Sequence, residues 1–378
     1  MKRQPGQVRD AILAVMEDSP QGATLSDIHS RVNALVGEVP ASSVRSYLRL
    51  NTPEQFVRME RAQYALRGFE DFEPQARAAK IDDEQDFAFD RSLLCRCDCM
   101  DWLSLRASNS VHAVVTDPPY GMFEYSQEQQ KKLRDGKGGV WRIPPSFDGS
   151  KRAPLPRFTV LKEADLAALE RFFLQWAHRL LPVLVPGANV LVASNPLVSH
   201  VVAGALSRGG LERRGELVRL VMTMRGGDRP KHAHEEFSDV SVMPRSMWEP
   251  WLIFRKPIEG RVQDNLRKWK TGGFRRISAT KPFGDVIVSA PTRSTERKLA
   301  PHPSLKPQAF LRQLVRGALP LSEGLILDPF AGSGSTLAAA NAMGLASIGL
   351  EKDVEYFNVA QRAIPKLSEL KLTQSVAR

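Results

Sequence analysis

The sequence predicts an α/β fold with a parallel sheet, preceded by a small separate domain that mixes helices and strands. From about residue 90, strand-like and helix-like segments alternate, as they do in βαβ units. Two short apolar runs, 112–116 and 325–328, look like buried strands, and each is followed by a polar or small-residue loop. Residues 69–89 are acidic and typical of a linker between the two parts.

Residues 1–68 are expected to form the small domain. Apolar residues at helical spacing predict three helices, and the alternating segments 55–59 and 63–67 predict a hairpin. Three helices and a hairpin resemble a winged helix-turn-helix domain, in which the third helix enters the major groove of DNA. The resemblance makes three outward-facing residues of that helix candidate DNA contacts: Arg45, Ser46 and Arg49. A protein-interaction domain is the alternative.

Residues 90–378 are expected to form the large domain. Within it, residues 163–181 predict an amphipathic helix and residues 188–193 a buried strand. Residues 121–155 are rich in charge, glycine and proline and lack apolar periodicity. So long a segment is functional or disordered, and the functional interpretation is a mobile loop beside a catalytic motif.

Composition favours a polyanionic partner. The net charge is +11, and residues 201–300 hold 20 Lys and Arg against 11 Asp and Glu, so most of the excess lies there. No apolar stretch is long enough to cross a bilayer, and the polar N-terminus does not look like a signal peptide, so a cytoplasmic location is expected. The three cysteines, Cys95, Cys97 and Cys99, are expected to be reduced thiols, and no metal site is predicted.

The tetrad Asp117-Pro118-Pro119-Tyr120 is the most informative motif. It follows a predicted buried strand, and ligands bind at the carboxyl ends of strands in open α/β sheets. Asp117 can accept a hydrogen bond from an exocyclic amine, and a carbonyl of the Pro-Pro segment can accept another. Tyr120 can stack on a flat heterocycle. Alone, the tetrad could equally be a turn after a strand.

A second group of residues surrounds the predicted strand 325–328. A loop of small residues, 329–336, leads from it into a helix, and the next strand ends at Glu351. Glycines let a backbone approach a ligand at a helix N-terminus, and an acid at the end of the next strand can bind two ribose hydroxyls. The loop is neither a Walker loop nor a good dinucleotide fingerprint. Just upstream stands the proline-rich segment His302-Pro303-Ser304-Leu305-Lys306-Pro307.

Together these motifs resemble the DNA amino-methyltransferases in their beta permutation, over roughly residues 90–365. In that family the catalytic tetrad precedes the cofactor loop, as it does here. The resemblance implies a Rossmann-like sheet with this permuted motif order and S-adenosyl-L-methionine as the cofactor. It implies a target-base pocket at Asp117, Pro118, Pro119 and Tyr120. The implied cofactor residues are Asp98, Asp117, Lys306, Pro307, Asp328, Phe330, Ala331, Gly332, Ser333, Gly334, Ser335, Thr336 and Glu351. Cys97 stands where the family usually has a glycine before Asp98.

The expected activity is methylation of adenine N6 in a base flipped out of duplex DNA. An Asp-first tetrad usually accompanies adenine in the family, whereas a Ser-first tetrad accompanies cytosine N4. Target recognition is expected within residues 196–300, and the candidate DNA contacts there are Arg225, Arg229, Lys231, Arg245 and Arg267. The resemblance allows a homodimer and a partner restriction endonuclease without implying either.

Four alternatives remain open. They are a cytosine-N4 methylase, a catalytically silent DNA-binding regulator, a protein-glutamine or RNA methylase, and a fused nuclease. Intact motif residues argue against the regulator, and the order of the motifs argues against the protein-glutamine and RNA methylases. The nuclease would use Asp285, Glu296 and Lys298, a short and common pattern.

Overall fold

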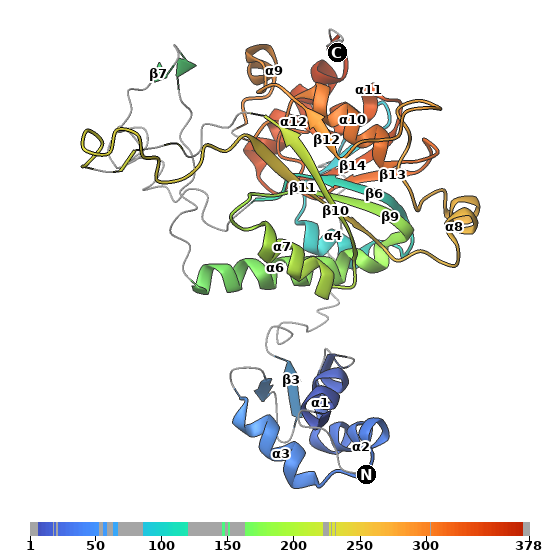
Figure 1. Cartoon of the computed structure of the whole chain (residues 1–378). Helices are drawn as coiled ribbons and strands as arrows, with labels where there is room; N and C mark the ends of the chain where they lie inside the picture. The colour runs from blue at the N-terminus through green and yellow to red at the C-terminus, as the bar shows by residue number, and fades with distance from the viewer. Residues whose placement is uncertain are drawn as a thin grey trace. The chain divides into compact units, whose positions relative to one another are not determined.

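The computed structural model divides the chain into two compact units, Met1–Ile81 and Asp82–Arg378 (Figure 1). Each unit is described by itself. The structure describes residues 7–17, 19, 22–52, 56–58, 63–66, 86–119, 146–147, 150–151, 163–221, 227, 229–230, 232–302 and 304–372.

Within its described residues, the first unit contains three helices and three short strands. In chain order these are α1 (Gln7–Glu17), β1 (Ala23–Thr24), α2 (Leu25–Val36), α3 (Ala41–Leu50), β2 (Phe56–Arg58) and β3 (Gln63–Leu66). The strands pair antiparallel in the order β1-β3-β2. The Thr24 hydroxyl accepts a hydrogen bond from the Asp27 N–H, which caps the start of α2. The predicted three helices and hairpin are therefore confirmed.

Helix α3 has one buried and one exposed face. Val44 and Leu48 are fully buried in the core of the unit, because they lie four residues apart on the same side of the helix. Arg45, Ser46 and Arg49 are exposed, as the apolar spacing predicted. Their contact with DNA stays a prediction.

The second unit is built on a nine-stranded sheet. Its order is β12-β10-β11-β9-β6-β13-β14-β5-β4. The bounds are β4 (Asp86–Phe89), β5 (Ser92–Cys95), β6 (Val111–Thr116), β9 (Leu184–Ala193), β10 (Glu212–Leu220), β11 (Trp248–Arg255), β12 (Val286–Val288), β13 (Leu325–Asp328) and β14 (Ala346–Leu350). Strands β9, β6, β13, β14 and β5 run parallel, whereas β11 pairs antiparallel with both β9 and β10. The predicted Rossmann-like α/β sheet is confirmed.

Helices cover both faces of this sheet (Figure 1). One face carries α4 (Cys99–Leu105), α6 (Glu163–Val183) and α7 (Ser199–Arg208); the other carries α10 (Gln308–Ala318), α11 (Ser335–Ala342) and α12 (Val354–Ser368). Two further helices, α8 (Val262–Trp269) and α9 (Ser294–Leu299), lie in the connections. Phe173 and Trp176 fill the core beneath α6, and Phe310 packs edge-on against Trp251 on the opposite face.

Some boundaries differ from the sequence prediction. Residues 86–89, placed at the end of the acidic linker, form β4, because the alternating Phe87 and Phe89 pack against the core beside α12. Within 121–155 the structure describes only β7 (Ser146–Phe147) and β8 (Ser150–Lys151), so the predicted mobile loop otherwise lies outside the described residues. The predicted helix 163–181 and strand 188–193 are confirmed as α6 and β9.

Among the described residues, no helix combines the length and apolar character that crossing a membrane requires.

Candidate active site

The predicted site residues follow the carboxyl ends of four neighbouring parallel strands. Asp117 follows β6, Asp328 ends β13, Glu351 follows β14, and Asp98 lies just beyond β5. Because parallel strands place their carboxyl ends at one edge of a sheet, segments more than 200 residues apart in the sequence meet here. Thr116, the last residue of β6, donates a hydrogen bond to Asp328 Oδ1 at 2.7 Å and joins the two central strands.

A pocket opens at this edge. Its lining residues are Asp117, His302, Ser304, Leu305, Lys306, Leu311, Asp328, Phe330, Ala331, Gly332, Ser333, Ser335 and Thr336. Most of the predicted cofactor residues are therefore brought together. The predicted cofactor residues that do not line it are Asp98, Pro307, Gly334 and Glu351.

The glycine loop after β13 needs its glycines. Gly332 has a φ of +52°, and a Cβ there would lie 3.1 Å from His302 Nε2. Gly334 has a φ of +76°, and a Cβ there would lie 2.5 Å from Ile364 Cγ1 on α12. A side chain at either position would be strained by the backbone, and one at Gly334 would also push α12 away.

Two carboxylates of the site are held by backbone donors. Glu351 accepts hydrogen bonds from the Gly332 and Asp353 N–H groups, both at 2.8 Å, and burial raises its pKa. Asp328 accepts from the Thr116 hydroxyl and from the Phe330 N–H at 3.2 Å. Burial is the main reason that the pKa of Asp328 is raised to about 6. Both groups thus shape the loop by accepting hydrogen bonds from it.

Asp98 interacts with other residues than the carboxylates of the pocket do. It caps α4 by accepting from the Met100 N–H at 2.8 Å, and it lies 3.6 Å from the Lys352 ammonium. Burial raises the pKa of the neighbouring thiols Cys97 and Cys99 to about 12, so both are protonated at neutral pH. In the part of the chain that the structure describes, no group of His, Cys, Asp or Glu has the arrangement of a metal site.

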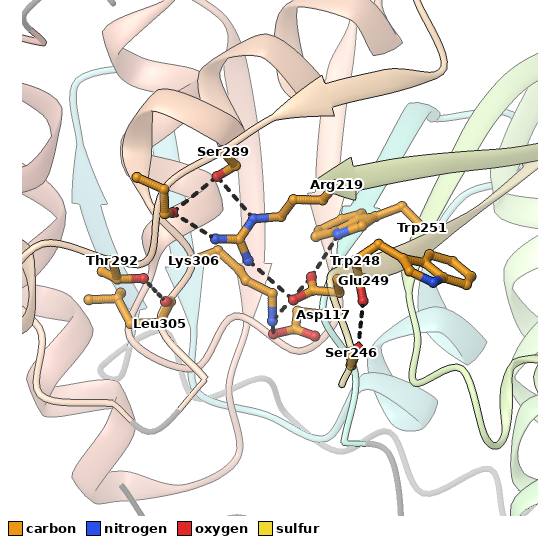
Figure 2. Close-up of polar contacts among 11 residues, drawn as sticks. Asp117, Arg219, Ser246, Trp248, Glu249, Trp251, Ser289, Thr292, Leu305 and Lys306 are labelled. Atoms are coloured by element: carbon orange, nitrogen blue, oxygen red, sulfur yellow. Dashed lines mark hydrogen bonds and ion pairs between the residues drawn. The ribbon is translucent and has the colours of Figure 1, made fainter. Parts of the chain in front are cut away.

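Asp117 forms an ion pair with Lys306 across the site (Figure 2). Lys306 Nζ also lies 3.7 Å from Glu249 Oε1. Burial acts to lower the pKa of Lys306, but the carboxylates of Asp117 and Glu249 outweigh it, so the pKa is raised and the ammonium stays charged. Pro118 is buried and Pro119 exposed, and Tyr120 lies outside the described residues.

Glu249 and Arg219 belong to the same charge network, and sequence reasoning missed both. They are cross-strand partners on β11 and β10 and form an ion pair at 3.1 Å. The Trp251 indole N–H donates to Glu249 Oε1 at 2.8 Å (Figure 2). The sequence offered one local indication of this pair, a charged residue within or beside each apolar strand segment. Arg and Glu are rarely buried unless they are paired, so a charge in such a segment suggests a partner.

His302 lines the pocket as a neutral ring. Its Nδ1 accepts a hydrogen bond from the Ser304 N–H at 3.2 Å, so the proton of the neutral ring is on Nε2, which faces Gly332. Burial, followed by the charge of Lys306, lowers the pKa of His302 to about 4. The sequence showed this residue in the proline-rich segment without giving it a role.

Of the predicted DNA contacts of the second unit, the structure describes Arg229, Arg245 and Arg267. Arg225 and Lys231 lie outside the described residues, Arg229 is exposed, and Arg245 is half-buried. Arg267 lies on α8, whose Asn265 donates to the Pro186 carbonyl near the amino end of β9.

The position of Arg267 therefore differs from that of the pocket. Asp117 lies beside the carboxyl end of β9, because Thr116 pairs with Val192. The strand between Pro186 and that end spans roughly 20 Å. Arg267 also forms an ion pair with Asp264 at 2.9 Å.

The residues of the alternative nuclease pattern have other roles. Glu296 is buried and accepts hydrogen bonds from the Gln308 N–H at 2.9 Å and the Arg293 N–H at 3.2 Å. Glu296 thus caps two turns of the chain. Asp285, the other acid of the pattern, is exposed.

Comparison with known proteins gives a consistent family. A family model of the N6/N4 methyltransferase type, described as "DNA methylase", matches residues 111–362. The Type II methyltransferase M.HindIII of Haemophilus influenzae is 25% identical over 276 residues, which cover 67% of this chain and 88% of the relative. The DNA adenine methyltransferase YhdJ of Escherichia coli is 38% identical over 133 residues, covering 32% of this chain and 45% of the relative. Among solved structures, the cytosine-N4-specific PvuII DNA methyltransferase matches with a TM-score of 0.48 and 13% identity, over 75% of this chain and 94% of that one.

Proposed function

The chain belongs to the N6/N4 DNA methylase family, and we propose that it transfers a methyl group from S-adenosyl-L-methionine to adenine N6 in double-stranded DNA. The observation that carries the proposal is the position of Asp117. Its carboxylate lines the same pocket as the glycine loop that follows β13, and the two strands are joined by the Thr116–Asp328 hydrogen bond. An amine acceptor and a cofactor loop thus share one pocket.

The residues of the pocket suit this cofactor. Gly332 leaves the backbone open to a ligand, and α11 begins at the loop, where helix N–H groups favour an anionic group. Lys306 lines the pocket, near the proposed methionine end of the cofactor, while Asp117 and Asp328 offer negative charge for a sulfonium or an amino group. We assign the ribose hydroxyls to Glu351, which directly supports Gly332.

The residues of the tetrad orient the target amine. S-adenosyl-L-methionine supplies, when bound, a methyl group on a positively charged sulfur. Asp117 and the Pro118 carbonyl would accept the two amine hydrogens, which directs the nitrogen lone pair toward the methyl carbon. Asp117 or water would take the proton that the amine nitrogen loses when it gains the methyl group. Tyr120 would stack on the flipped base. Proximity and orientation are the main contributions of the chain.

Adenine is favoured over cytosine because the tetrad begins with Asp117. The test is mass spectrometry of nucleosides from unmethylated DNA incubated with the protein and S-adenosyl-L-methionine. N6-methyladenine is the expected product. N4-methylcytosine would keep the class and the site but overturn the choice of base. Cofactor binding without any methylated base would favour the silent regulator.

Replacing Asp117 with alanine should abolish methylation, with a loss of at least roughly 1,000-fold, because the amine loses its charged acceptor. Binding of S-adenosyl-L-methionine, measured by calorimetry, should weaken much less. Full methylation by Asp117→Ala would refute the assignment of the site.

The first unit is proposed to add non-specific DNA contacts through the exposed face of α3, with Arg45, Ser46 and Arg49 nearest the phosphates or bases. Arg45→Ala with Arg49→Ala should reduce the slope of log K against log salt by about 2, because two phosphate contacts are lost. Arg9→Ala, at an exposed position on α1, is the control. Equal slopes for the double variant and the wild type would count against the proposal.

The rest of target recognition is proposed to lie within residues 196–300. Arg225, Arg229, Lys231 and Arg245 are retained as candidate contacts there, whereas Arg267 would need a DNA path that reaches the other edge of the sheet.

A further inference from the structure

Four charged side chains form a balanced cluster at the active site. Asp117 and Glu249 are anionic, and Lys306 and Arg219 are cationic (Figure 2). Their side chains are between 6% and 18% exposed, so water screens them little. In such surroundings each charge depends on a counter-ion, because an unpaired buried charge is costly.

One end of the cluster is anchored. Besides Glu249, the Arg219 guanidinium donates to Ser289 Oγ at 3.1 Å and to the Ala290 carbonyl at 3.2 Å. Glu249 in turn accepts from Arg219 and from the Trp251 indole. The Arg219–Glu249 pair sits directly across two antiparallel strands, so its geometry is fixed by the sheet.

Lys306 lies between this anchored pair and Asp117. Its ammonium contacts Asp117 and is 3.7 Å from Glu249 Oε1. A charge-assisted hydrogen bond of this kind is about 2.8 Å long, so a shift of about 1 Å would bring Lys306 into hydrogen-bond range of Glu249. Lys306 can therefore change its principal counter-ion without leaving the cluster.

Resting on the proposed function, we propose that Glu249 is a positioning residue for methyl transfer, the anchored counter-ion that takes Lys306 when Asp117 binds the target amine. Lys306 contacts one of the two oxygens of Asp117, Oδ2, so the target amine and the ammonium would share one carboxylate. Glu249 keeps the buried ammonium paired while that contact is exchanged. Arg219 supports the exchange by holding Glu249 in place.

The test compares two glutamates on the same pair of strands. Glu249→Gln keeps the size of the side chain and an acceptor for Trp251 but removes the charge. Glu212→Gln is the matched control, because Glu212 also pairs with an arginine across β10 and β11, at 2.7 Å from Arg255 and at the other end of the strands. Both substitutions remove the carboxylate charge of one cross-strand ion pair on the same two strands.

Single-turnover methyl transfer to DNA and the dissociation constants of cofactor and DNA are the readouts. We expect Glu249→Gln to slow methyl transfer roughly 10- to 100-fold, because Lys306 then stays on Asp117 and the amine is misplaced. Its dissociation constants should stay within about 3-fold of wild type, because Glu249 does not line the pocket. Glu212→Gln should match the wild type in every readout.

Two outcomes would overturn the proposal. One is equal transfer rates for Glu249→Gln and Glu212→Gln. The other is a slowed rate that is fully explained by weaker cofactor binding, which would place Glu249 in the cofactor site instead.

A wild-type protein that methylates no DNA would reject the proposed function separately. Crystal structures of wild type and Glu249→Gln, each with DNA and a non-reactive cofactor analogue bound, would then decide the position of Lys306. Lys306 nearer Asp117 in the variant than in the wild type supports the proposal, and an unchanged position refutes it.

Discussion

The two halves of the large sheet hold their carboxylates in different ways. In the half that carries the glycine loop, Asp328 and Glu351 accept hydrogen bonds mainly from backbone N–H groups and a threonine hydroxyl. In the half that carries β10 and β11, Glu249 is held by Arg219 and lies near Lys306. The first half depends on the path of the backbone, whereas the second depends on charge balance. Different substitutions should therefore damage each half.

The largest effect is expected where charge balance is broken. Arg219→Met removes one cation from the buried cluster and should lower the free energy of unfolding by about 3–5 kcal/mol, because Glu249 loses its main partner. Arg214→Met, on the same strand, is the control, since Arg214 is 48% exposed beside Glu212. It should cost less than about 1 kcal/mol. Urea denaturation measures the free energy of unfolding of both variants. Similar losses for the two would contradict the special role of charge balance in this half of the sheet.

A smaller effect is expected where the backbone path is disturbed. Gly334→Ala should destabilise the protein by about 2–3 kcal/mol, because the Cβ meets Ile364 at 2.5 Å in addition to the strain of a positive φ. Gly344→Ala shares a positive φ, +68°, but has open space, so it should cost only about 1 kcal/mol. Thermal unfolding of the two variants separates the clash from the strain. Identical shifts in melting temperature for the two variants would show that α12 moves away from the added Cβ at little cost.

The smallest effect should have the opposite sign and depend on pH. The pKa of Asp328 is about 6 in the folded protein against an ordinary value of 3.8. Between these values the folded protein retains a proton that the unfolded chain has lost, so this group costs stability as the pH rises. Asp328→Asn cannot ionise, and its oxygen can still accept from Thr116 and Phe330.

Asp328→Asn should therefore gain stability relative to wild type across pH 4 to 6, reaching roughly 1–3 kcal/mol at pH 7. Urea denaturation at pH 4 and pH 7 measures the gain. A difference that is the same at both values would mean that Asp328 titrates alike in the folded and unfolded chains.

The sequence was most informative where chemistry is local. The positions of Asp117, Asp328 and Glu351 predicted the strand ends that meet, because each residue stands beside an apolar run that marks its strand. The glycine loop was predicted for the same reason, since Gly332 and Gly334 report a backbone conformation within a few residues. The exposed face of α3 followed from helical spacing alone.

The charge cluster could not be predicted in this way. Arg219 and Glu249 are cross-strand partners, and nothing near either residue in the sequence fixes that register. The separation of Arg267 from the pocket had the same origin, because only the attachment of α8 to the start of β9 determines it. Pairing between distant strands depends on the whole sheet, so residues that act through it are found from the structure.

The anchoring of Glu249 also bears on how a chimera of this protein could be designed. Arg219 and Glu249 lie at the two ends of the connection between β10 and β11, and Glu249 also lies near Lys306, which comes from a different segment. A chimera that replaced β10 and β11 together with their connection would carry a foreign partner for Lys306. Splicing inside residues 221–247, with both strands left native, would transplant the intervening segment and keep the charge cluster intact.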